Sequence, residues 1–238
     1  LTDISIKNAS FSNDGAKIAV AEFSLADVVF EGGMMVKGKT SINGLKVPLV
    51  LINEIDRSAA HTISNFTDNE DFVLSFSTSV DFNTVNGTFD AEINFGADGF
   101  AKVTLICGLA GLDAKQIQEA SKVSDIFEAM QIWALIVEDL SISVVTLKYV
   151  DEQLANTLLA GISDNELATM SEMQVNMLLG QYPKMADQLK IALGAFLDGK
   201  NSFNASAKAT SPLKIDEMQQ LFASGDLTNF MSFEFSGS

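Results

Sequence analysis

Few residues in this chain could carry out covalent chemistry. It contains one histidine, His61, and one cysteine, Cys107. A nucleophilic relay needs a base beside a serine or cysteine hydroxyl or thiol, and His61 is the only imidazole base. The neighbours of His61 in sequence include Glu54, Asp56 and Ser58. A hydrolase that uses His61 is therefore one hypothesis, and an exposed loop histidine without a catalytic role is the simpler interpretation.

Metal and cofactor chemistry is not indicated. One histidine and one cysteine cannot supply the nitrogen and sulfur ligands of an ordinary zinc site. Asp68, Glu70 and Asp71 could bind calcium through oxygen atoms, but they lack the spacing of an EF-hand loop. The glycine-containing segment at Gly96 has no lysine and therefore does not match a phosphate-binding loop. The sequence predicts no catalytic residue, no metal and no cofactor.

Apolar residues at helical spacing in the second half of the chain form the main candidate site. Methionine fills irregular apolar space because its side chain is flexible and polarisable. These residues are either ordinary core or the lining of an adaptable, lipid-sized pocket between helices and a sheet. The candidate ligand-binding residues are Phe127, Met130, Met170, Met177, Met185 and Phe196.

The first half of the chain is predicted to be rich in strands. Apolar residues alternate with serine and aspartate from Phe72 to Phe82, as expected for a strand with one buried face. Turns at Asn86-Gly87 and at 96–99 continue this strand into a three-stranded meander that ends at Cys107. An Asn43-Gly44 pair predicts a further hairpin turn. Residues 52–70 are polar and are predicted to be irregular.

The second half is predicted to be mostly helical, with a strand-to-helix transition at 138–161. The alternation slips near Val144 and Val145, which indicates a β-bulge, and Asp151 is a candidate N-cap. Ser163 and Glu166 have the spacing of a capping box. Further helices, a strand of small residues at 203–209 and a closing strand follow. We therefore predict an α+β fold, in which the helices of the second half pack on the apolar face of a long twisted antiparallel sheet.

Composition limits the partners. The chain has 238 residues, 31 acidic and 15 basic, and a formal net charge of −16. This charge disfavours nucleic acid and electrostatic docking on anionic lipid. Hydrophobic residues make up 47% of the chain, yet no run is long enough to span a membrane. We predict a single domain at 1–238, with a strand-rich half at 1–110 and a helix-rich half at 111–238.

Two stretches carry a family resemblance, LKYVDEQLANTLLA at 147–160 and ALGAFLDGKNSFNASAKATSPLKIDEM at 192–218, together with the helices between them. They resemble uncharacterised proteobacterial envelope proteins, related in style to the YdgA-like and AsmA-like periplasmic proteins. The resemblance covers about the last hundred residues. It implies a periplasmic or exported protein with long β-sheets, and it implies no catalytic residue.

The leading hypothesis is a non-enzymatic envelope protein. It would bind a lipid or another apolar ligand, or assist envelope assembly with a protein partner. We expect it in the periplasm, anchored to the inner membrane by a segment absent from this chain. The alternatives are a structural or protein-interaction module with a fully packed core, and the hydrolase that uses His61.

Overall fold

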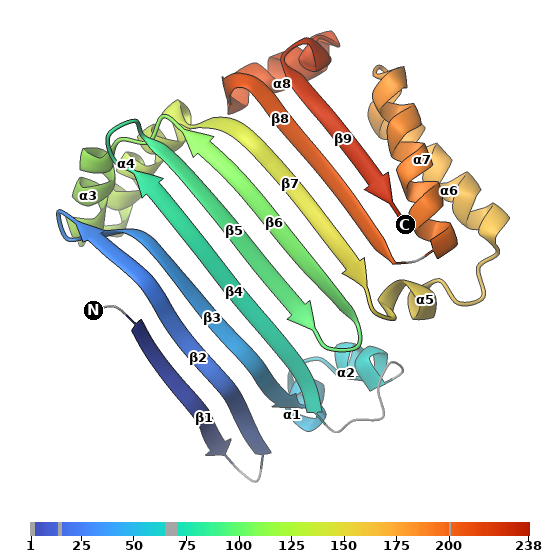
Figure 1. Ribbon diagram of the computed structural model, residues 1–238, viewed down its shortest axis with the longest axis horizontal. Coiled ribbons are helices and arrows are strands. Elements are labelled where there is room, and N and C mark those ends of the chain that lie inside the picture. The colour runs from blue at the N-terminus through green and yellow to red at the C-terminus, as the bar shows by residue number, and fades with distance from the viewer. Residues whose placement is uncertain (1–2, 14–15, 65–70, 200) are drawn as a thin grey trace.

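The computed structural model describes residues 3–13, 16–64, 71–199 and 201–238. All nine strands join one twisted antiparallel sheet, in which they lie side by side in chain order (Figure 1). The predicted α+β class and long antiparallel sheet are therefore confirmed. The strands are β1 (Asp3–Asn13), β2 (Ala16–Glu31), β3 (Met34–Pro48), β4 (Asp71–Asn83), β5 (Thr88–Ala97), β6 (Ala101–Ala110), β7 (Ser141–Asp151), β8 (Ser202–Lys214) and β9 (Met231–Gly237).

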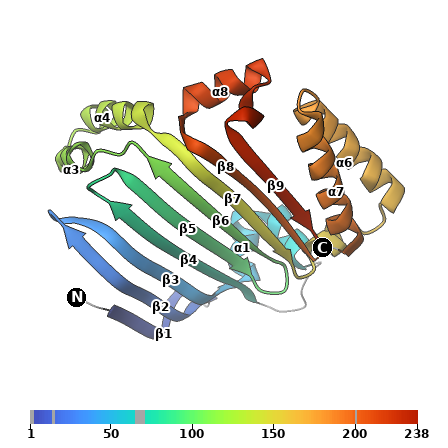
Figure 2. The ribbon, with the colours of Figure 1, turned by 45° about the horizontal axis from the view of Figure 1, so that its top comes forward.

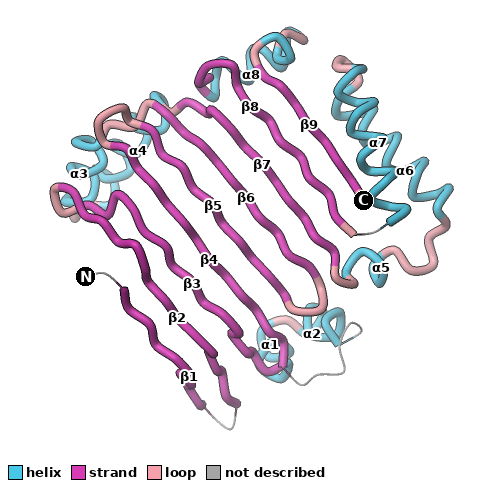
Figure 3. Tube along the Cα trace, viewed as in Figure 1, coloured by secondary structure: helices cyan, strands magenta, loops and turns pink. Residues whose placement is uncertain are grey.

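The helices occupy four connections between strands (Figure 3). They are α1 (Leu49–Ile55), α2 (Arg57–Ser64), α3 (Ala114–Lys122), α4 (Ile126–Asp139), α5 (Leu154–Leu158), α6 (Asp164–Leu179), α7 (Pro183–Gly199) and α8 (Ile215–Ser224), with a 3-10 turn η1 (Leu227–Asn229). Helix α7 packs mainly on β9 and also on β8, and α6 packs on α7. Figure 2 shows α6, α7 and α8 gathered at the β8–β9 side of the sheet, with α3 and α4 at one end of the strands.

The strand register sorts side chains onto two faces. Because successive side chains of a strand point to opposite faces, partners in register share a face across the whole sheet. The apolar face includes two rows: Ile6, Phe23, Ile42, Phe76, Phe95, Val103, Tyr149 and Phe203, and Ile4, Leu25, Thr40, Thr78, Ile93, Leu105, Leu147, Ala205 and Phe235. The polar face includes the row between them: Ser5, Ser24, Ser41, Ser77, Asn94, Thr104, Lys148, Asn204 and Ser236.

The main core cluster lies where helices meet the apolar face at β8 and β9. Its buried members are Tyr182, Met185, Leu213, Leu227 and Met231. The Tyr182 hydroxyl donates to the carbonyl oxygens of Leu221 and Phe222, at 3.1 and 2.8 Å, which connects the start of α7 to α8. Helix α7 also approaches β9 very closely at Gly237, where an added Cβ would fall on the carbonyl oxygen of Ala192.

The predicted hairpin at Asn43-Gly44 is wrong. Strand β3 continues through both residues, and the register with β4 shifts between Ile42 and Leu45. Gly44 has φ +60°, so it supplies the left-handed residue of a bulge instead of a turn. Neighbouring β2 and β4 pair with β3 on both sides of this point, and their pairing keeps the strand continuous.

Other local predictions are confirmed. The Phe72–Phe82 alternation, the Asn86-Gly87 turn and the three-stranded meander correspond to β4, β5 and β6. The predicted bulge near Val144 is present, because the register of β7 shifts at this point against both β6 and β8. The Ser163–Glu166 capping box begins α6.

The prediction of an irregular segment at 52–70 is wrong for its first part. Residues 49–55 and 57–64 form the short helices α1 and α2. Helix α1 is short and has no buried residue, so it lacks the buried apolar stripe on which a helix prediction depends. Residues 65–70, which include Asp68 and Glu70, lie outside the described residues.

Gly237, at the α7–β9 contact, and Gly194, on an open part of α7, should respond oppositely to alanine. Gly237→Ala should lower the free energy of unfolding by about 1–3 kcal/mol, because α7 and β9 must separate to accommodate the methyl group. Gly194 lies in the interior of α7, and beyond the local helix backbone no heavy atom lies within 4 Å of its Cβ position, so Gly194→Ala should raise the free energy of unfolding by about 0.5–1 kcal/mol. Urea unfolding followed by circular dichroism measures both. Equal effects of the two substitutions would contradict the close approach at Gly237.

Candidate functional site

The six predicted ligand-binding residues lie on three helices and do not form one site. Phe127 and Met130 are on α4, with 74% and 62% of their surfaces exposed. Met170 and Met177 are on α6 and are also exposed. Met185 on α7 is buried in the main core cluster. The sixth residue, Phe196, also lies on α7, where its ring packs edge-on against Tyr149 on β7 and Phe203 on β8.

The centre of the apolar face is only partly covered. Phe76, Phe95, Leu105 and Leu147 lie on four different strands, and each remains exposed. Their positions in the two apolar rows make them neighbours across the sheet. No large side chain of the described residues is completely buried. The sheet therefore presents a continuous apolar surface between its helix-covered side at β8–β9 and its edge at β1.

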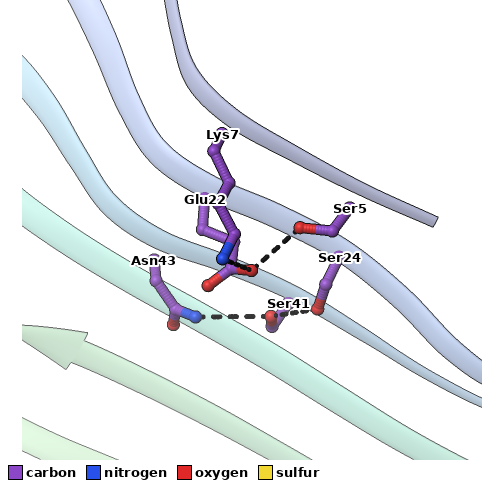
Figure 4. A network of polar contacts seen from close by, with 6 residues as sticks. All are labelled: Ser5, Lys7, Glu22, Ser24, Ser41 and Asn43. Carbon is purple, nitrogen blue, oxygen red and sulfur yellow. Dashed lines mark hydrogen bonds and ion pairs between the residues drawn. The ribbon is translucent and has the colours of Figure 1, made fainter. Parts of the chain in front are cut away.

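The polar face is hydrogen-bonded along its surface. Ser24 and Ser41 share a hydrogen bond of 2.7 Å, and Ser5 donates to Glu22 at 2.9 Å, as part of the network in Figure 4. Further across the sheet, Thr104 donates to Asn94 Oδ1 at 2.6 Å. Short polar side chains that hydrogen-bond to one another in this way are suited to a surface that faces water. The apolar face is thus the candidate binding surface.

A pocket of about 390 Å³ lies where α6, α7 and α8 cover this face. We call it the apolar pocket, and its lining comes from three strands, three helices and the η1 turn. The lining residues are Val145, Leu147, Leu178, Leu179, Met185, Leu189, Ala205, Ser206, Ala207, Phe222, Leu227, Phe233 and Phe235. Of the six predicted residues, only Met185 is among them. The volume lies at the lower end of the range of about 300–1,000 Å³ that is usual for small-molecule sites.

The small side chains of β8 explain why this space is open. Ala205 and Ala207 stand between larger neighbours in register, Leu147 and Val145 on β7 and the phenylalanines of β9. A methyl group between two long side chains leaves room that the overlying helices do not fill. The alternation of alanines at 203–209 was visible in the sequence as a strand of small residues. This strand forms the floor of the pocket because it lies between β7 and β9, and that position depends on strand order.

A buried carboxylate, that of Asp151, lies at the end of β7. Asp151 Oδ1 accepts hydrogen bonds from the Tyr149 hydroxyl at 2.5 Å and from the backbone N–H of Ala155 at 2.7 Å. The predicted capping role is thus confirmed in part, because Asp151 binds an N–H group of α5 from two positions before the N-cap residue Gln153. Burial, together with the hydrogen bond to Asp151 and the charge of its carboxylate, raises the pKa of the Tyr149 hydroxyl.

The residues with potential covalent chemistry lie elsewhere. His61 is exposed on α2, and its backbone carbonyl accepts a hydrogen bond from Ser64 Oγ at 2.8 Å. Cys107 is half-buried on the apolar face of β6, and burial raises the pKa of its thiol. Within the described residues, no group of three or more histidine, cysteine or acidic side chains could hold a metal ion. The hydrolase remains an untested prediction.

A family model described as "Uncharacterized protein" matches residues 94–233, which run from β5 to β9. The chain belongs to this family. The match begins about fifty residues before the stretches that carry the resemblance noted in the sequence. It includes all lining residues of the apolar pocket except Phe235. No curated protein matches the chain significantly.

None of the helices in the described part of the chain combines the length and apolar character needed to cross a bilayer. Strands β1 to β4 precede the segment that the family model matches, yet they extend the same sheet and the same apolar face. The candidate surface therefore includes both the family segment and the strands before it.

Tyr149→Phe should change the stability of the protein at alkaline pH. A tyrosine whose pKa is raised on folding contributes stability that is present below about pH 10 and is lost as the unfolded chain ionises above it. The wild-type free energy of unfolding should therefore fall more steeply between about pH 9.5 and 11 than that of the variant. Urea titrations at a series of pH values measure this slope.

At neutral pH, Tyr149→Phe should also lower the free energy of unfolding by about 1–3 kcal/mol, because it removes a hydrogen bond from a buried carboxylate. Ser163→Ala, at the start of α6, is a suitable control, since it removes a cap without altering a tyrosine. Identical alkaline slopes in wild type and Tyr149→Phe would contradict the assigned environment of the hydroxyl.

Proposed function

We propose that the protein is a non-enzymatic envelope protein that binds a lipid or another apolar ligand on its apolar face. The observation that carries this proposal is the exposed centre of that face, where Phe76, Phe95 and Leu105 lie side by side. Monomeric soluble proteins rarely expose contiguous apolar patches larger than a few hundred Å², and those that do generally use them for binding.

The contrast between the two faces supports the same function. Both faces belong to the same nine strands, but the serine, threonine and asparagine side chains of the polar face bond to one another. The leucine and phenylalanine side chains of the apolar face have no equivalent way to reduce the free-energy cost of contact with water. Burial of apolar surface contributes roughly 25 cal/mol per Å², so a hydrocarbon ligand is favoured on this side.

The envelope location is part of the proposal and rests on the resemblance at 147–160 and 192–218. We propose a periplasmic protein of the YdgA-like or AsmA-like kind. The net charge of −16 is compatible with a protein that takes up lipid from water or from a partner, instead of adhering to an anionic membrane surface. A role in assembling envelope components would use the same face.

Native mass spectrometry of the protein purified from a proteobacterial host, followed by organic extraction, tests the proposal. We expect co-purified lipid, and we expect the stripped protein to bind a fluorescent fatty acid. Absence of both would contradict lipid binding and would favour a structural or protein-interaction module.

A pair of variants on β6 tests the assignment to one face. Leu105→Gln should weaken binding of the fluorescent fatty acid several-fold, because it places an amide at the centre of the apolar face. Ile106→Gln is the matched control, since it makes a similar change one residue further along, on the polar face. Equal loss of binding in the two variants would contradict the assignment.

A further inference from the structure

We infer that the apolar pocket holds a single unbranched acyl chain of a lipid whose head group is uncharged or zwitterionic. This inference rests on the proposed function and names the class of ligand. It concerns the pocket beneath α6, α7 and α8, and not the open apolar surface over the centre of the sheet.

The size of the pocket suits one chain. A volume of about 390 Å³ accommodates roughly a dozen groups of the size of a water molecule, at ~30 Å³ each, and a methylene group is of similar size. Two acyl chains of membrane length would not fit into this volume. One chain of about twelve carbon atoms would fill it, and the additional carbons of a longer chain would remain outside the rim in water.

The lining can bind hydrocarbon but not a head group. Twelve of its thirteen residues are apolar, and the remaining one is Ser206. The Ser206 hydroxyl belongs to the polar face, where it shares a hydrogen bond of 2.8 Å with Thr146. No lining side chain is therefore available to bond a polar head. Because an unbonded polar group loses free energy when it is buried, the head must stay outside.

Burial within the lining shows which end of the pocket is open. Met185 and Leu227 are only 6% exposed, so we place the closed end of the pocket at these two residues. Leu178 on α6 and Phe222 on α8 are 62% and 40% exposed, and Leu147 on β7 is 40% exposed. These three residues form the rim. The Leu147 side of the rim continues into the apolar row through Leu105, so a chain can enter from the open face.

The net charge of the protein selects the head group. A head held at the rim lies in the field of a molecule with a net charge of −16. This field opposes an anionic head, such as the carboxylate of a fatty acid, and leaves an uncharged or zwitterionic head unaffected. Salt screens such a field over about 10 Å at 0.1 M ionic strength. The discrimination should therefore diminish as salt is added.

The first test uses 1-monoacylglycerols with chains of 8 to 16 carbon atoms, titrated below their critical micelle concentrations by calorimetry. Burial of each methylene group contributes ~0.8 kcal/mol, so affinity should rise about fourfold per carbon. It should then level off near twelve carbon atoms, where the pocket is full. A rise that continues to sixteen carbons would indicate binding along the open face and would overturn the inference.

The fatty acid of twelve carbons should bind several-fold more weakly than the matching monoacylglycerol at low salt, and equal affinity would overturn the choice of head group.

The second test fills the pocket. Ala207→Leu adds side-chain atoms to its floor and should weaken binding of the twelve-carbon monoacylglycerol at least tenfold. Ala9→Leu is the control, since it makes the same change on the apolar face of β1, far from the pocket. Circular dichroism confirms that each variant is folded, and the chain-length series on the wild-type protein stands if Ala207→Leu does not fold.

The outcomes of these tests separate the two proposals. Wild-type binding that Ala207→Leu does not weaken would overturn the assignment to the pocket while leaving lipid binding to the apolar face intact. No binding of any monoacylglycerol or fatty acid to the wild-type protein would overturn the proposed function itself.

Discussion

The structure depends on one constraint, which is that the side-chain period of two is kept in register across nine antiparallel strands. This register places isoleucine, phenylalanine and leucine on one face, and serine, asparagine and threonine on the other. The bulges at Gly44 in β3 and near Val144 in β7 each add one residue, and each restores the two faces after the slip. Without these corrections, a strand would present its apolar residues to water beyond the slip. One face of the sheet is therefore apolar and the other polar over its whole width. The proposals about ligand binding follow from this difference.

The helices use only part of this apolar face. Helix α7 lies close to β9 because Gly237 has no side chain, and Tyr182 joins the start of α7 to α8. These contacts build a core at one side of the sheet and leave Phe76, Phe95 and Leu105 exposed at its centre. Ala205 and Ala207 on β8 are small residues in the lining of the apolar pocket. Their combination with large neighbours on β7 and β9 leaves the apolar pocket as the transition between the covered and the open parts.

Much of the fold could be predicted from local patterns, because strands, turns and caps are determined by nearby residues. The alternation from Phe72 to Phe82, the Asn86-Gly87 turn and the Ser163–Glu166 capping box are examples. The Asn43-Gly44 pair led to a wrong hairpin prediction, because the pairing of β3 with β2 and β4 overrode the turn preference of these two residues.

The site was harder to predict, because it depends on which strands are neighbours. Helical spacing correctly identified Met185 as inward-facing, but it gave the same weight to Met170 and Met177, which α6 exposes. The alanines that form the pocket floor have no chemical signature of their own. Strand order alone places them between the larger residues of β7 and β9.

The most direct measurement is a crystal structure of the protein with a monoacylglycerol of twelve carbons brominated at the end of its chain. We expect an anomalous bromine peak inside the apolar pocket, near Met185 and Leu227, with the glycerol head outside the rim formed by Leu178 and Phe222. Bromine located only over the open centre of the sheet, or a pocket closed by inward movement of Phe222 with no bound chain, would contradict it.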